Sequence, residues 1–141
     1  MKIETTFNPA EQDRKQLKES FRLYDLSIIP NLPSEDEEQL VAVYLRRDDG
    51  TLGGGVEANI YWDGVEIEIL WVSEELRGAG FGTRLMQEVE KQAKEKGAGI
   101  AFLKTGEARE FYESLGYEVY GILEDRPIGT KLYHMKKRLR K

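Results

Sequence analysis

The sequence predicts a mixed α/β (α+β) fold, in which an antiparallel meander is followed by alternating helices and strands. Three strand-like runs come first, at residues 40–45, 52–61 and 65–72. Asp49-Gly50 and Asp63-Gly64 separate them, and both dipeptides tolerate the positive backbone angles of hairpin turns. The alternating part follows, and a glycine-rich loop connects it to the meander.

The second half of the chain carries clear helix signals. The expected elements are a helix at 80–96, a strand at 100–104, a helix at 107–115 and a closing strand pair at 117–123 and 130–139. The first helix has apolar residues at a spacing of four from 81 to 93, and Glu90 precedes Lys94 at the spacing of a stabilising ion pair. Thr105 is expected to cap the second helix, which Gly116 ends.

The N-terminal part is expected to hold a short strand and a helix. The strand spans residues 2–7, and Asn8-Pro9 supplies an N-cap followed by proline at the first helical position. The helix is expected to end near Asp25, before a loop at 29–38. Its apolar stripe consists of Leu17, Phe21 and Tyr24. We expect this stripe to face a core.

The composition is typical of one folded domain, which we expect to span residues 1–141, with 40% apolar residues. The chain has no cysteine and one histidine, which argues against disulfides, thiol nucleophiles and metal sites. The net charge of -5, with one basic run at 136–141 interpreted as a solvated strand end, argues against nucleic-acid binding. No apolar run approaches the roughly 18 residues that span a membrane. We therefore expect a cytoplasmic protein with no membrane partner.

The loop at 77–83 lies between a strand and a helix and contains Gly78, Gly80 and Gly82. Such a loop leaves backbone N–H groups unpaired at the positive end of a helix dipole, where a phosphate can bind. The alternative is a turn that merely needs flexible residues. A dinucleotide fingerprint is excluded because Thr83 stands where its third glycine is required. The Gly-Lys-Ser or Gly-Lys-Thr of an NTPase phosphate loop is also absent.

Two motifs resemble those of the GNAT superfamily of N-acetyltransferases, in particular its small bacterial members. The first is Leu70-Trp71-Val72 followed by Arg77-Gly78-Ala79-Gly80-Phe81-Gly82. The second, Ala-x-x-Phe-Tyr-x-x-x-Gly-Tyr, consists of Ala108, Phe111, Tyr112, Gly116 and Tyr117. The resemblance implies the GNAT fold, a mixed and mostly antiparallel central sheet of six to seven strands. This sheet is splayed at the cofactor site and flanked by about four helices.

The resemblance also implies that acetyl-CoA is the co-substrate, with its pyrophosphate on the glycine loop. Its pantetheine arm would pair with the backbone of Leu70 and Val72, while the side chain of Trp71 faces the opposite side and belongs to the core. Thr105 stands where many family members carry asparagine. The residues expected to bind the cofactor are Leu70, Trp71, Val72, Arg77, Gly78, Ala79, Gly80, Phe81, Gly82, Thr83, Thr105, Ala108 and Phe111.

The implied reaction is direct attack of an amine on the thioester, without a covalent enzyme intermediate. Tyr112 matches the family tyrosine that protonates the departing thiolate. Glu66 and Glu68 are candidates for removing the amine proton, as is an ordered water, because an alkyl amine has a pKa of about 10.4. Counting by two places both carboxylates on one strand face with Leu70 and Val72. Either carboxylate can instead simply belong to a solvated strand face.

The acceptor is expected to be a primary amine of a small molecule or a peptide, contacted by the loops at 25–38 and 124–129. Acidic residues at 35–38 would suit a cationic amine. The resemblance to the family also suggests a homodimer. Two other interpretations stay open, a non-catalytic acyl-CoA-binding or regulatory module and a plain interaction domain. The shortened segment 103–107 favours the first of these, because that region borders cofactor and acceptor in the family.

Overall fold

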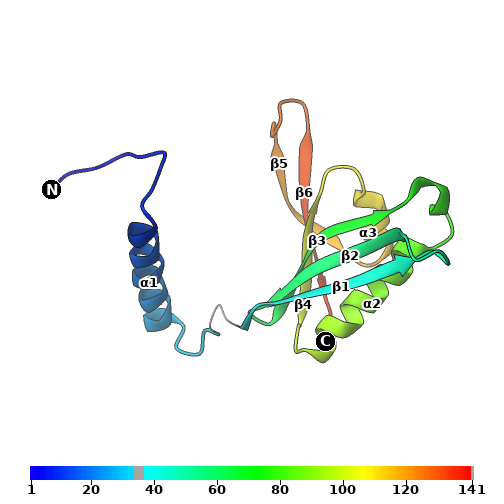
Figure 1. Ribbon diagram of the computed structural model, residues 1–141, viewed down its shortest axis with the longest axis horizontal. Helices are drawn as coiled ribbons and strands as arrows, with labels where there is room; N and C mark the ends of the chain where they lie inside the picture. The colour runs from blue at the N-terminus through cyan, green and yellow to red at the C-terminus, as the bar shows by residue number, and fades with distance from the viewer. Residues whose placement is uncertain (34–36, 141) are drawn as a thin grey trace. The chain divides into compact units, whose positions relative to one another are not determined.

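The computed structural model describes residues 1–33 and 37–140 (Figure 1). Its contacts divide the chain into two units, Met1–Ser34 and Glu35–Lys141, and the single domain predicted from the sequence stays a prediction. The predicted acidic acceptor segment 35–38 falls partly on residues 34–36, which lie outside the described part. None of the helices that the structure describes is long and apolar enough to cross a membrane.

The first unit contains helix α1 (Glu11–Ile28). The predicted strand at 2–7 was wrong, because these residues form no ladder with another strand. The helix begins after Ala10 rather than after Asn8, whose N–H donates to the Thr6 hydroxyl in a turn. It also extends beyond the predicted end near Asp25. None of its residues is buried, so packing of its apolar stripe on a core stays a prediction.

The second unit is built on a six-stranded sheet in the order β1-β2-β3-β4-β6-β5. Its strands and helices are β1 (Gln39–Arg46), β2 (Leu52–Tyr61), β3 (Gly64–Val72), α2 (Phe81–Glu95), β4 (Ile100–Thr105), α3 (Arg109–Ser114), β5 (Glu118–Glu124) and β6 (Lys131–Arg138). Neighbouring strands are antiparallel except for the β3–β4 pair, which is parallel. The mixed, mostly antiparallel sheet is confirmed, with three α-helices among the described residues rather than about four.

The hairpin turns lie close to where the Asp-Gly dipeptides predicted them. Gly50 has a φ of 88° in the β1–β2 turn. In the β2–β3 turn the positive φ angles fall on Trp62 and Asp63, at 47° and 60°, and Gly64 already belongs to β3. The turn therefore sits one residue earlier than predicted, because Trp62 adopts the left-handed conformation that the prediction assigned to the glycine.

Figure 1 shows α2 lying along one face of the sheet, and the core side chains lie between the two. The predicted helix stripe is confirmed for Leu85, Met86, Val89 and Ala93, which are buried, whereas Phe81 at its start lines a cavity instead. Facing them are Val56, Ala58, Ile60, Val65 and Ile67. Each large aliphatic side chain contributes about 2 kcal/mol by leaving water. This packing holds the N-terminus of α2, and with it the glycine loop, at the end of β3.

The ion pair predicted between Glu90 and Lys94 is wrong. In the structure, Glu90 binds Lys137 of β6 at 2.7 Å. The basic run at the C-terminus is therefore not simply a solvated strand end. Lys137 reaches Glu90 across the helix–sheet interface, where the pair is better shielded from water than a pair along the exposed helix face would be.

Candidate active site

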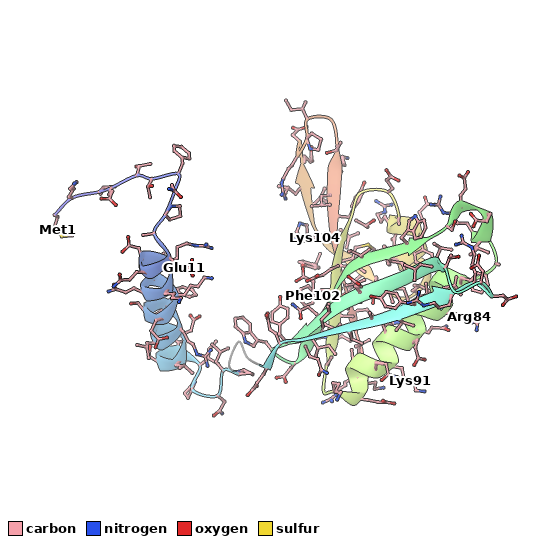
Figure 2. All side chains as sticks on the ribbon, viewed as in Figure 1. Met1, Glu11, Arg84, Lys91, Phe102 and Lys104 are labelled. Carbon is pink, nitrogen blue, oxygen red and sulfur yellow. The ribbon has the colours of Figure 1, made fainter. Side chains whose placement is uncertain are left out.

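A cleft opens where β3 and β4 separate. The parallel ladder joins Gly64–Ile67 only to Ile100–Leu103, after which the two strands share no register. A cavity of about 500 Å³ lies beyond this point. Its lining includes Glu68, Leu70, Thr105 and Tyr112. Lys104 of β4, labelled in Figure 2, also belongs to the lining. The predicted splay of the sheet is confirmed.

A β-bulge in β3 decides which carboxylate faces this cleft. Ile67 pairs with Ala58 and Ile69 pairs with Glu57, so Glu68 is an extra residue without a partner on β2. A bulge of one residue reverses the alternation of side chains along the strand. The prediction that Glu66 shares a face with Leu70 was therefore wrong.

The two carboxylates consequently have different surroundings. Glu68 lines the cleft together with Leu70 and Tyr112. Glu66 is opposite Asn59 and accepts a hydrogen bond of 3.4 Å from the Tyr61 hydroxyl. Burial, and then the charge of Glu66, raise the pKa of Tyr61, which keeps that hydroxyl a donor. Glu66 is thus hydrogen-bonded to Tyr61 on the face of the sheet opposite Leu70.

Trp71 faces away from Leu70 and Val72, as predicted, but it does not belong to the core. Leu70 pairs with the buried Val56 and so lies on the core face of β3. Trp71 pairs with Gly55 and lies on the opposite face. The residue is 48% exposed. Gly55 has no side chain to cover the indole, which explains why the core prediction was wrong.

The glycine loop forms the second part of the site. Gly78 and Gly80 have φ angles of 82° and 85°, and open space surrounds the position of a Cβ at either residue. Gly80 is the N-cap of α2 and no side chain caps this helix. Among the described residues, the N–H groups of 78–83 donate no turn or cap bonds. Unpaired donors at the positive end of a 15-residue helix are suited to an anion.

A cavity of about 610 Å³ lies over this loop. Nearly all the predicted cofactor residues line it, namely Leu70, Trp71, Val72, Arg77, Gly78, Gly80, Phe81, Gly82, Thr83, Ala108 and Phe111. Ala79 is not part of the lining, and Thr105 lines the neighbouring cleft instead. The Nε of Arg77 donates to the carbonyl of Val72 at 2.8 Å, so this side chain also holds the loop to the end of β3.

Helix α3 closes the other side of both cavities. A Cβ on Gly82 would lie 3.3 Å from Cζ of Phe111, so the first turn of α2 rests directly against this ring. Phe111 therefore both packs and borders the loop cavity. The two aromatic rings of Phe111 and Tyr112 meet edge to face, with centroids 5.1 Å apart.

Thr105 ends β4 rather than capping α3 directly. Its hydroxyl accepts a hydrogen bond of 3.1 Å from the N–H of Ala108, and the helix begins at Arg109. The predicted start at residue 107 was too early, because residues 106–108 form the turn that this bond closes. Glu107 in this turn lines both cavities. Sequence reasoning missed Glu107, although it directly precedes the alanine of the second motif.

Tyr112 is 8% exposed and faces the cleft. Burial raises the pKa of its hydroxyl. Unlike the hydroxyl of Tyr117, that of Tyr112 has no hydrogen-bond partner within the ranges that the structure describes. The ring is buried, but the unpaired hydroxyl is not among the buried polar atoms of the described residues, so it is accessible to a ligand in the cleft.

Comparisons with known proteins agree with this geometry. A model of the Acetyltransferase (GNAT) family matches residues 2–117. Blasticidin-S acetyltransferase of Streptomyces morookaense is 31% identical over 104 residues, 72% of this chain and 76% of that protein. The crystal structure of an acetyltransferase from Bacillus cereus ATCC 14579 is 30% identical and has a TM-score of 0.81, covering 96% of this chain and 97% of that chain. The crystal structure of aminoglycoside 6'-acetyltransferase type Ii is 29% identical and has a TM-score of 0.65, covering 72% of this chain and 70% of that chain.

We predict that ionisation of Tyr112 contributes to alkaline unfolding. Because burial holds the folded-state pKa above 10.0, the unfolded state loses this proton first as the pH rises. The stabilising contribution is complete below about pH 10 and falls above it, by at most about 1.4 kcal/mol per pH unit. Urea unfolding between pH 9 and pH 11 should show a smaller decline for Tyr112→Phe than for the wild type.

The matched control is Tyr120→Phe, because Tyr120 is 53% exposed. This variant should keep the wild-type decline. Identical declines for Tyr112→Phe and the wild type would contradict the raised pKa of Tyr112.

Proposed function

Because the chain belongs to the GNAT acetyltransferase family, we propose that it transfers the acetyl group of acetyl-CoA to a primary amine of a small molecule or a peptide. One observation carries the proposal. The loop cavity and the cleft share Leu70, Glu107 and Ala108 in their linings, and so form one path from the glycine loop to Tyr112. An elongated ligand with an anionic group at one end and a reactive group at the other fits such a path.

The loop end of the path would hold the pyrophosphate of acetyl-CoA. The N–H groups of 78–83 donate no turn or cap bonds and would supply the donors, and the backbone is left-handed at Gly78 and Gly80. The pantetheine arm would follow β3 between Leu70 and Val72, where β4 has diverged and the strand edge is free. The thioester then lies in the cleft, beside the bulge at Glu68.

In the proposed reaction, the nitrogen of a neutral amine attacks the thioester carbonyl. A backbone N–H freed by the bulge would stabilise the developing oxyanion. As the C–N bond forms and the C–S bond breaks, the attacking amine releases one proton and the sulfur leaves. Tyr112 donates its proton to that sulfur, which departs as a thiol. Tyr112 holds its proton at neutral pH, because burial raises its pKa above the ordinary tyrosine value of about 10.

Glu68 is the proposed group that accepts the amine proton, directly or through a water. It faces the cleft with Tyr112, whereas Glu66 is hydrogen-bonded to Tyr61 on the opposite face. The presence of a donor and an acceptor in one cleft favours catalysis over a module that only binds acyl-CoA. Two similar proteins are named for blasticidin S and for aminoglycosides, which supports a small-molecule amine as the acceptor.

We predict that the protein releases coenzyme A thiol from acetyl-CoA only when an accepted amine is present. Tyr112→Phe should lower kcat by about 100-fold, because general acid catalysis contributes that much or more. The KM for acetyl-CoA should stay within about twofold, because the phenyl ring still fills the space. Initial rates with a thiol reagent and a panel of amines measure both quantities.

Tyr120→Phe is the control for this substitution and should keep the wild-type kcat. Binding of coenzyme A without turnover of any amine would instead support the non-catalytic module. Equal kcat values for the wild type and Tyr112→Phe would remove Tyr112 from the mechanism.

We predict that Glu68→Gln and Glu66→Gln differ sharply, although both remove one carboxylate from β3. Glu68→Gln should lower kcat/KM for the amine by about 100-fold at pH 7. This loss should shrink toward pH 10, because an amine of pKa about 10.4 then needs less help in losing its proton. Glu66→Gln should stay within about twofold. Rate profiles from pH 6 to pH 10 test the difference, and the opposite order would show that Glu66 is the base.

A further inference from the structure

Three side chains meet at one point, Glu90 of α2, Lys137 of β6 and Tyr117, which lies in the turn between α3 and β5. The Tyr117 hydroxyl donates to Oε2 of Glu90 at 2.8 Å, and Nζ of Lys137 donates to Oε1 of the same carboxylate at 2.7 Å. Nζ of Lys137 also lies 5.6 Å from the centre of the Tyr117 ring. We call these three residues the Glu90 junction. Neither family motif contains Glu90 or Lys137, and both lie outside the cleft and loop linings.

The junction is partly buried, and Glu90 and Lys137 also line a surface cavity over α2 and β6. The side chain of Glu90 is 11% exposed, that of Lys137 is 27% exposed, and Tyr117 is 3% exposed. A carboxylate this deeply placed needs its hydrogen bonds, and removal of one partner leaves a poorly solvated charge. Burial, and then the charge of Glu90, raise the pKa of Tyr117, so its hydroxyl stays a donor. The geometry of the junction is therefore narrowly fixed.

Tyr117, which the junction holds in place, contacts Tyr112 directly. Their rings meet edge to face with centroids 5.8 Å apart, and the N–H of Tyr117 donates to the carbonyl of Tyr112 at 3.0 Å. Helix α3 has only six residues, too few to be stable without tertiary contacts. Its C-terminal end is held by the left-handed turn at Gly116 and by Tyr117. The orientation of Tyr112 therefore depends on where Tyr117 is held.

Glu90 belongs to the same helix that presents the glycine loop. It lies nine residues after Phe81, about 14 Å along the axis at 1.5 Å per residue. In Figure 2, the label Arg84 marks the first turn of α2, and the label Lys91 marks the residue next to Glu90. The helix is rigid and packed on the sheet, so a contact at Glu90 fixes α3 relative to the loop at the helix start.

We propose that Glu90 is a positioning residue, which sets the Tyr112 hydroxyl at the correct place relative to a thioester held by the glycine loop. The proposal rests on the proposed acetyltransferase function. Glu90 touches neither the cofactor path nor the amine, and acts through Tyr117. Its loss should therefore affect the chemical step more than cofactor binding.

The test compares Glu90→Gln with Glu95→Gln, which makes the same change of charge at an exposed position of α2. Glu90→Gln keeps the size of the side chain and an oxygen for Tyr117, but leaves Lys137 without its counter-charge. We expect kcat to fall about tenfold with the KM for acetyl-CoA within about twofold. Glu95→Gln should keep both wild-type values. Equal kcat values for the two variants would overturn the proposal.

A second variant separates positioning from general loss of structure. Tyr117→Phe keeps the ring but removes the hydroxyl that Glu90 binds, and should lower kcat to a similar extent. Because Glu90 is proposed to act on Tyr112 only through Tyr117, the double variant Glu90→Gln/Tyr117→Phe should be little worse than either single variant. Multiplying effects on kcat would show that Glu90 and Tyr117 act independently, contrary to the proposal.

Hydrogen exchange supplies a readout that does not depend on turnover. The amide of Tyr112 donates to the carbonyl of Ala108 at 3.1 Å and reports on the order of α3. In Glu90→Gln it should exchange about tenfold faster than in Glu95→Gln, while the amides of Leu85 and Val89 exchange equally in the two. Unchanged exchange at Tyr112 would overturn the proposal. A wild-type protein that binds coenzyme A but acetylates no amine would count against the proposed function alone.

Discussion

The parallel pairing of β3 with β4 ends at Ile67 and Leu103, and the rest of the site depends on that divergence. It opens the cleft in the middle of the sheet and leaves the edge of β3 free beside Leu70. The bulge at Glu68 lies just beyond the last paired residue, and Glu68 lines the cleft. A fully paired sheet would close this space, because neighbouring strands lie only about 4.8 Å apart.

The two cavities are neighbours that share lining residues, and helices α2 and α3 meet beside them. Gly82 allows the first turn of α2 to rest against Phe111, and Ala108 and Glu107 border both cavities. The loop and Tyr112 are thereby fixed at opposite ends of one path. Packing of α2 on the sheet supports the loop end, while the short α3 depends on its contacts with neighbouring residues.

The sequence predicted the features that depend on local patterns. Hydrophobic periodicity identified α2 and the three strands of the meander, and the glycine loop and second motif located most of the residues that line the site. Features set by tertiary pairing were missed. The bulge at Glu68 depends on register with β2, the exposure of Trp71 depends on Gly55 beside it, and Glu90 binds a lysine 47 residues away. No alternation or helix spacing encodes these pairings.

Titration calorimetry with coenzyme A is the most direct test of the claim that the loop and the splayed strands bind this cofactor. The wild type should bind one molecule per chain. Gly80→Ala should weaken binding by about tenfold, because a left-handed backbone costs a residue with a Cβ about 1–2 kcal/mol. Gly129→Ala imposes the same strain in the β5–β6 turn, at a φ of 88°, and should bind as the wild type does. No binding to the wild type, or equal weakening by both substitutions, would contradict the account.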